Sequence, residues 1–183
     1  MFSLVTLGAA SVEPTDPAQL LALEDRSAPV EMVGRSSPLV SASGKYELVN
    51  HDRSGPAPNH KVILKTAAGH RVLLSRSYYR GLEASWAPAS DVLVINDFAG
   101  SNYTECIVDT IQPGKIAEEN LVEELMHVQP QLQLERYIHV HVQAVKWLGP
   151  DSFLVRVRAW ASPTIKGWFD KDYTYDLRHG FEL

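Results

Sequence analysis

Two histidines stand close together in the C-terminal half of the chain. His139 and His141 are two residues apart in a segment where apolar and polar residues alternate. In a β-strand this spacing projects both imidazoles from one face, and two imidazoles are half of a zinc site. The candidates for a third ligand are His127, His60, His70 and Asp97. The alternative is a solvated strand face that binds nothing, and the absence of the usual zinc-ligand spacings favours it.

A second group of candidate ligands lies in one predicted loop. Its oxygen atoms would suit a hard cation such as calcium, and they belong to Asp97, Ser101, Asn102 and Glu105. The spacing does not match the helix-loop-helix calcium motif. Because Asn, Asp and Ser also stabilise turns by bonding the nearby backbone, we favour a structural turn. We therefore expect no cofactor, with zinc and calcium as the alternatives.

An arginine–tryptophan stripe is the third candidate. Residues 153–159 alternate between apolar and polar types, so Arg156, Arg158 and Trp160 should share the face opposite the core. Such a stripe could bind an anionic sugar or a protein strand through hydrogen bonds and cation–π contacts. The alternative is that the Trp168 segment covers it. The candidate binding residues are Arg156, Arg158, Trp160, Asp97 and Asn102.

No complete catalytic motif accompanies these candidates. The sequence has neither Gly-x-Ser-x-Gly nor a glycine-rich phosphate loop. Cys106, the single cysteine, lies in an apolar run, where a thiol usually behaves as a small buried hydrophobe. We therefore expect a non-enzymatic protein- or glycan-binding module. The alternative is a metal-binding protein or metal-dependent hydrolase that uses His139 and His141.

Composition limits the class of protein. The chain has 183 residues, of which 45% are apolar and 21% charged, and this suits a single globular domain with a real core. A net charge of −5 argues against a broad nucleic-acid interface. No apolar stretch is long enough to span a membrane.

The N-terminus resembles the apolar part of a secretory signal, although it lacks the basic residues that open one. A short buried strand is the alternative. We expect a leader or flexible segment over residues 1–14 and one domain over residues 15–183. Asp16 and Pro17 predict a short helix that ends near Arg26. The protein is accordingly expected to be periplasmic or secreted, or otherwise cytoplasmic.

Short apolar runs separated by turn residues predict a mainly β protein. The expected strands are residues 46–49, 61–65, 71–74, 92–95, 104–109, 137–144, 153–159 and 173–177. The run at 92–95 is almost wholly apolar, as in a strand covered on both faces. Residues 51–60 and 162–171 are expected to be irregular.

One helix is expected within the β region, directly after the turn at residues 112–115. Its apolar stripe would consist of Ile116, Leu121, Val122, Leu125 and Met126. Its opposite, acidic face would consist of Glu118, Glu119, Glu123 and Glu124.

One sequence motif occurs three times in the chain. It consists of a large apolar residue, a tight polar turn and then a strand. It is clearest at residues 86–97, and weaker versions occupy residues 40–49 and 147–155. We expect Trp86 to anchor the central unit by packing beneath the Pro88 turn and against the face of Val92 and Val94.

The motif Trp-x-Pro-x-Ser-Asp before four apolar residues, at 86–95, resembles the blade motif of bacterial propeller repeats of the Tol-system periplasmic type. The asparagine- and glycine-containing loop at residues 96–102 also looks like one seen in small uncharacterised bacterial exported proteins. Residues 147–155 match the blade motif loosely, and residues 40–49 keep only the Ser-x-Gly-Lys turn. Three units cannot close a propeller ring. The resemblance therefore implies antiparallel β-meanders like an incomplete β-propeller, with one or two short covering helices, and it implies no activity.

Overall fold

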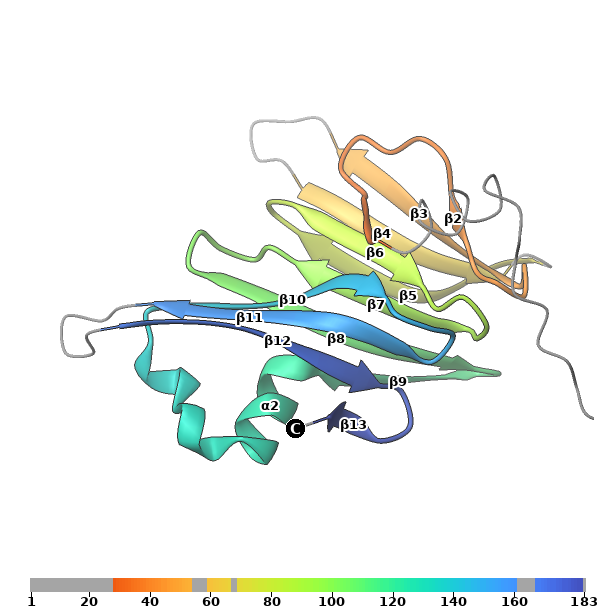
Figure 1. The fold of residues 1–183 in the computed structure, drawn as a ribbon. Helices are drawn as coiled ribbons and strands as arrows, with labels where there is room; N and C mark the ends of the chain where they lie inside the picture. Colours follow the sequence, from red (N-terminus) through yellow and green to blue (C-terminus); the bar gives the residue numbers. More distant parts are fainter. Residues whose placement is uncertain (1–27, 54–58, 67–68, 161–166, 183) are drawn as a thin grey trace, which may run out of the picture.

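The computed structural model describes residues 28–53, 59–66, 69–160 and 167–182 (Figure 1). The leader expected over residues 1–14 and the helix expected after Asp16 lie outside these residues. The described chain is mainly β, as predicted, and its sheets are rich in antiparallel pairs. Its helical elements are α2 (Leu121–Val128) and the short 3-10 turns η1 (Pro130–Leu132) and η2 (Leu134–Arg136). None of the described helices has the length and apolar character that crossing a membrane requires.

The described strands form two sheets. The smaller sheet consists, in order of pairing, of β2 (Leu39–Val40), β3 (Tyr46–Arg53), β4 (Asn59–Thr66) and β5 (Gly69–Tyr78). The larger sheet runs through β1 (Val30–Glu31), β6 (Leu82–Trp86), β7 (Val92–Asp97), β8 (Tyr103–Gln112), β10 (His139–Trp147), β11 (Ser152–Trp160), β12 (Trp168–Asp176) and β13 (Gly180–Glu182). In addition, β9 (Lys115–Asn120) pairs with β8.

A short parallel pairing divides the larger sheet into two parts. β8 and β10 pair only at Tyr103 with Val140 and at Thr104 with His141, whereas the other described pairings are antiparallel. β10 then leaves β8 and approaches β7. The strands β10–β13 thus form a separate wing, which packs with α2 beneath the central strands (Figure 1).

The central strands β6–β8 have a core on each side. Leu93 and Ile95 pack with residues of the smaller sheet. Val92 and Val94, on the opposite face of β7, pack with α2 and with the inner side of β10–β13. All four side chains are buried, so the apolar run at 92–95 is a strand covered on both faces, as predicted.

Trp86 lies on the other face of the central sheet from the one expected. Its register partner is Leu93, and partners in antiparallel strands share a face. The indole therefore stacks on Tyr46 at 6.4 Å between ring centroids, and its Nε1 donates to the Leu39 carbonyl at 2.9 Å. The expected packing against the Val92 side is wrong, because sequence alone did not give the register between β6 and β7.

The expected helix begins later than predicted. Residues 115–120 form β9, which folds back on β8 through a turn where Gly114 has a φ of 77°. The helix α2 begins only after Asn120, whose side-chain oxygen accepts from the Val122 N–H at 2.9 Å. Leu121, Val122 and Leu125 still form its buried face. Asn120 followed by Glu123 was the missed signal, because this spacing is typical of a helix N-terminus.

Two regions expected to be irregular are partly strand. β3 continues to Arg53 and β4 begins at Asn59, so the loop between them is shorter than residues 51–60. β12 begins at Trp168, inside the stretch expected to be irregular. Its first residues are mostly exposed and polar. Main-chain pairing with β11, not burial of side chains, holds them in the sheet.

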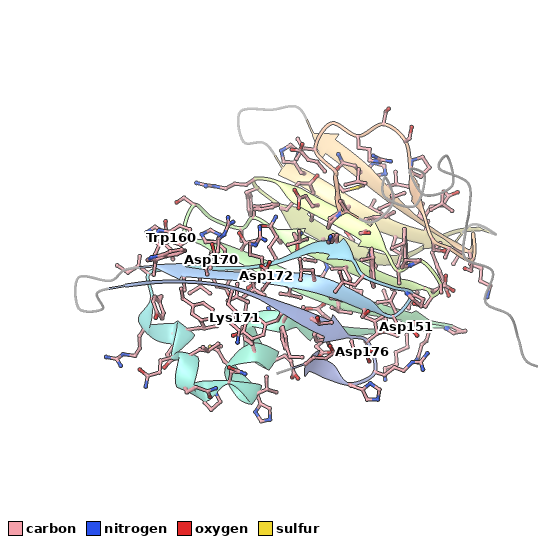
Figure 2. All side chains as sticks on the ribbon, viewed as in Figure 1. Asp151, Trp160, Asp170, Lys171, Asp172 and Asp176 are labelled. Carbon is pink, nitrogen blue, oxygen red and sulfur yellow. The ribbon has the colours of Figure 1, made fainter. Side chains whose placement is uncertain are left out.

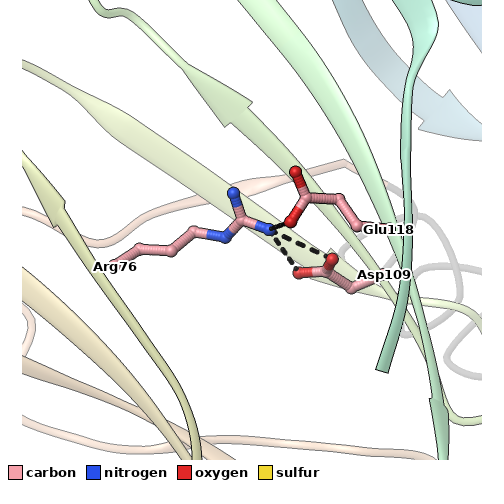
Figure 3. A network of polar contacts seen from close by, with 3 residues as sticks. All are labelled: Arg76, Asp109 and Glu118. Carbon is pink, nitrogen blue, oxygen red and sulfur yellow. Dashed lines mark hydrogen bonds and ion pairs between the residues drawn. The ribbon is translucent and has the colours of Figure 1, made fainter. Parts of the chain in front are cut away.

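An ion pair joins the two sheets (Figure 3). Arg76 of β5 donates through Nη2 to both oxygens of Asp109 in β8, at 3.1 and 3.2 Å, and to Glu118 of β9 at 2.6 Å. The Asp109 side chain is 0% exposed. Burial raises its pKa, Arg76 opposes the rise and Glu118 adds to it. This pair therefore belongs to the interior.

Candidate functional site

Strands β10, β11 and β12 present one exposed face, here called the outer face. Cross-strand register arranges its side chains in rows, which are His139–Trp160–Trp168, His141–Arg158–Asp170, Gln143–Arg156–Asp172 and, beyond the irregularity in β10, Lys146–Leu154–Thr174. The intervening residues of β10 and β11, such as Val142 and Val155, point into the core and are buried. Alternation along the strands thus fixes the outer face on a packed scaffold.

Figure 2 shows Trp160, Asp170 and Asp172 on one side of β11 and β12, and Lys171 on the other. Lys171 takes an inward position of β12, where its Nζ lies 4.5 Å from the centre of the Tyr173 ring. The two aspartates were not among the residues selected from the sequence. Their signal was the alternation of Phe169, Tyr173 and Tyr175 with polar residues, which Lys171 interrupts.

The aromatic row contains two tryptophans, of which one stacks on histidines and the other is more exposed. Trp160 stacks on His139 at 5.2 Å and on His141 at 4.9 Å between ring centroids, with interplanar angles of 11° and 17°. It is 39% exposed, whereas its register partner Trp168 is 75% exposed. Trp168 therefore lies beside the stripe and extends it, and the alternative that the Trp168 segment covers the stripe does not hold.

Both arginines of the stripe are ion-paired. Arg156 donates through Nε and Nη2 to the two oxygens of Asp172, at 2.7 and 2.8 Å. Arg158 lies 3.4 Å from Asp170. The hydrogen bond from Arg156 lowers the pKa of Asp172, and the same bond raises the pKa of Arg156. The two positive charges predicted for this face are thus matched by two negative charges, which makes an anionic ligand a poor fit.

The two histidines do share one face, as predicted. His141 Nδ1 lies 2.7 Å from the Thr104 hydroxyl of β8, in a hydrogen bond. Burial lowers the pKa of His141, with smaller contributions from His139 and Arg158. His141 Nε2 and His139 Nδ1 are buried without a hydrogen-bond partner in the described residues.

The described structure brings no third metal ligand to these histidines. Within its residues, no three His, Cys, Asp or Glu side chains are placed to hold a metal ion. His127 is exposed in the last turn of α2, and His60 stacks on Tyr78 at 5.0 Å. The side chain of His70 lies outside the described part.

The residues of the predicted loop do not form one oxygen cluster. Asp97 is on the face of β7 that carries Ile95, towards the smaller sheet, and its pKa is raised by burial and by Glu105 and lowered by Arg76. Asn102 contributes to the wing through its backbone, since its carbonyl accepts from the Val140 N–H at 2.9 Å. Asn102 thus borders the outer face, whereas the side chain of Asp97 is directed towards the smaller sheet.

Asn96, which sequence reasoning missed, positions β10. Its fully buried amide donates to the Ala144 carbonyl at 2.9 Å and accepts from the Ala144 N–H at 2.8 Å. The side chain thereby replaces a strand partner where the β10–β11 register shifts. A second hydrogen bond joins β10 to β6, since Trp147 Nε1 donates to the Ser85 hydroxyl at 2.8 Å. These bonds hold the wing across the central strands.

Cys106 is buried, as predicted. It is 0% exposed within the core that α2 covers, and burial raises its pKa to about 12. A thiol of this kind is a poor nucleophile at neutral pH, because the thiolate is the reactive form.

Comparisons of the chain with protein-family models, with curated proteins and with solved structures find no match.

Proposed function

We propose that this protein is a non-enzymatic binding module whose working surface is the outer face of β10–β12. The observation that supports it is the gathering of two exposed tryptophans beside ordered Arg–Asp pairs on one face. Tryptophan and arginine are the side chains most enriched at binding hot spots. Their position on packed strands lowers the entropy lost on binding.

The test compares two exposed positions in one hairpin. Trp168 is part of the aromatic row, whereas Leu148 is 48% exposed at the β10–β11 turn, at the other end of the hairpin. Parent protein, Trp168→Ala and Leu148→Ala are passed over immobilised protein-rich and carbohydrate-rich fractions of the native host. Retention of the parent and of Leu148→Ala, with loss for Trp168→Ala, is expected. Equal retention of all three would contradict the assignment of this face.

The non-enzymatic part has its own test. Purified protein is offered ester, phosphate and peptide substrates. Turnover that a single substitution abolishes would contradict it.

We also propose export to the periplasm or cell surface, supported by the apolar N-terminal sequence. Fractionation of the native host tests this, since a cytosolic product that keeps residues 1–11 would contradict it. The likeness to an incomplete propeller remains part of the same proposal. The first unit forms its own sheet, as a blade would, whereas the second and third units share one.

A metal-binding protein is the second candidate, and a metal-dependent hydrolase would be its catalytic form. One observation favours it: buried nitrogens of His139 and His141 lack a hydrogen-bond partner in the described residues. Elemental analysis of protein purified without an affinity tag tests it. Stoichiometric zinc that disappears in a His139→Ala, His141→Ala double variant would support this candidate, and metal-free protein would remove it.

A further inference from the structure

The chemistry of the outer face narrows the class of its ligand, provided that the binding role proposed above holds. Its two central rows carry two arginines and two aspartates in lateral pairs. These two rows therefore carry no net charge to attract an anion or a cation. A ligand that binds here must gain affinity from hydrogen bonds and from contact with the tryptophans.

The ion pairs leave fixed donors and acceptors on the surface. The bidentate pair of Arg156 and Asp172 uses Nε and Nη2, and the guanidinium also carries N–H donors on Nη1. The carboxylate oxygens keep further lone pairs. Donors and acceptors thus stand side by side, and a hydroxyl group both donates and accepts. Neighbouring hydroxyls of a sugar fit this arrangement.

The aromatic row supplies the apolar part of such a site. The C–H faces of a sugar ring carry a weak positive potential, which the negative face of an indole attracts. Because strands are about 4.8 Å apart, the row from Trp168 to His139 spans roughly 10 Å. This length suits more than one sugar unit of a chain lying across the strands.

A protein partner fits the same face less well. Hot spots of protein interfaces lie near the centre of the contact and are surrounded by weaker contacts, and aspartate is depleted from such interfaces although arginine is enriched. Here the tryptophans lie at one end of the face, and ion pairs occupy its middle.

We infer that the outer face binds an uncharged glycan, with Trp168 and Trp160 contacting sugar rings and the Arg156–Asp172 and Arg158–Asp170 pairs binding hydroxyls. Affinity electrophoresis in native gels tests this. The gels contain hydroxyethyl cellulose, laminarin, dextran or galactomannan as neutral polymers, and polygalacturonate or heparin as anionic ones. Parent protein should be slowed by at least one neutral polymer and by neither anionic one.

Two variants, one in the aromatic row and one in the ion pairs, test which residues bind the polymer. Trp168→Ala should bind the polymer about two- to tenfold more weakly and be retarded less, because it loses an aromatic contact with the sugar ring. Leu148→Ala is the matched control and should migrate like the parent, because it lies roughly 25 Å away along the strands. Equal retardation of Trp168→Ala and the parent would overturn the inference.

The second variant combines Asp170→Asn with Asp172→Asn and so releases both arginines. It should lose retardation by the neutral polymer and gain retardation by polygalacturonate. If it does not, charge pairing is not what selects the ligand, and the inference falls.

The outcomes separate the inference from the function on which it rests. Binding by the protein-rich host fraction that protease abolishes and that needs Trp168, without retardation by any neutral polymer, overturns the glycan inference and leaves the binding module. Retardation of the parent by the anionic polymers also overturns it. A neutral polymer that slows the parent and every variant alike overturns both.

Discussion

Arginine and aspartate pair in two regions of this molecule, with different consequences. Between the sheets, Arg76 meets an aspartate that has no solvent exposure. On the outer face, Arg156 and Asp172 pair with more than a third of each side chain exposed. The first pair is enclosed by the fold and holds it together. The second keeps donors and acceptors that a ligand can reach, because more than a third of each side chain is exposed.

The tryptophans divide in the same way. Trp86 and Trp147 are buried, and both indole N–H groups donate to atoms of other strands. Trp160 and Trp168 are exposed at one end of the wing. Substitutions of buried residues should therefore affect stability, whereas substitutions on the outer face should affect binding.

The largest effect is expected at Trp86. Trp86→Ala should lower the free energy of unfolding by about 3–5 kcal/mol, the usual result of truncating a buried aromatic side chain. Urea unfolding measures it beside Trp168→Ala, which should stay within about 0.5 kcal/mol of the parent. The reverse order of the two variants would show that the interior and the binding face have been interchanged.

Arg76→Met should cost about 3 kcal/mol at neutral pH, because it leaves the buried Asp109 carboxylate unpaired. The pKa of Asp109 is already raised above 3.8 in the folded protein, and loss of Arg76 raises it further. A carboxyl group whose pKa is raised on folding contributes fully to the free energy of unfolding below pH 3.8, and this contribution is lost as pH rises through the folded pKa. The deficit of the variant should therefore shrink as pH falls towards 3.8.

Urea unfolding across this pH range measures the deficit. Arg156→Met is the matched control on the outer face and should leave the midpoint at that of the parent. A deficit for Arg76→Met that stays constant with pH would contradict the structural role of the buried pair.

Asn96→Leu should cost about 1–3 kcal/mol, because the buried N–H and C=O of Ala144 lose their partner. Asn102→Leu is the control: Asn102 also contacts β10, but through a backbone carbonyl that the substitution keeps. Thermal unfolding compares the two. Equal stability would mean that the Asn96 amide does not hold the wing in place.

The smallest effect is expected at His141. Its pKa is lowered mainly by burial, so its contribution to stability is present above 6.5 and is lost as pH falls below that value. His141→Gln should therefore lose less stability than the parent between neutral and mildly acidic pH. Trp160→Ala, which uncovers the ring, should act in the same direction. Parallel pH profiles for all three proteins would contradict this.

How far the sequence predicts the outer face depends on how local its signals are. Alternation in β10 and β11 is a local pattern, and it correctly assigned His139, Arg156 and Trp160 to the side away from the core. The pairing of each arginine with an aspartate of β12 depends on the register between β11 and β12, which local sequence does not give. The inward Lys171 also interrupted the alternation that would have identified β12 as a strand.

Local sequence patterns also could not predict how β10–β13 pack on the central strands. A parallel pairing of two residues between β8 and β10 leaves no periodic trace in the sequence. Asn96, which carries β10 across the central strands, looks like the polar end of a strand. The helix start was missed for a different reason, since Asn120 and Glu123 give a local signal that the acidic stripe concealed.

The four tryptophans of the chain give the most direct test of the central claim, that the outer face is the working surface and the two buried cores are structural. Their indole N–H signals, assigned with single Trp→Phe variants, are followed by NMR during titration with the host fraction or polymer that retains the protein. The account predicts that the signals of Trp160 and Trp168 shift, while those of Trp86 and Trp147 stay in place. Shifts confined to Trp86 and Trp147 would contradict it.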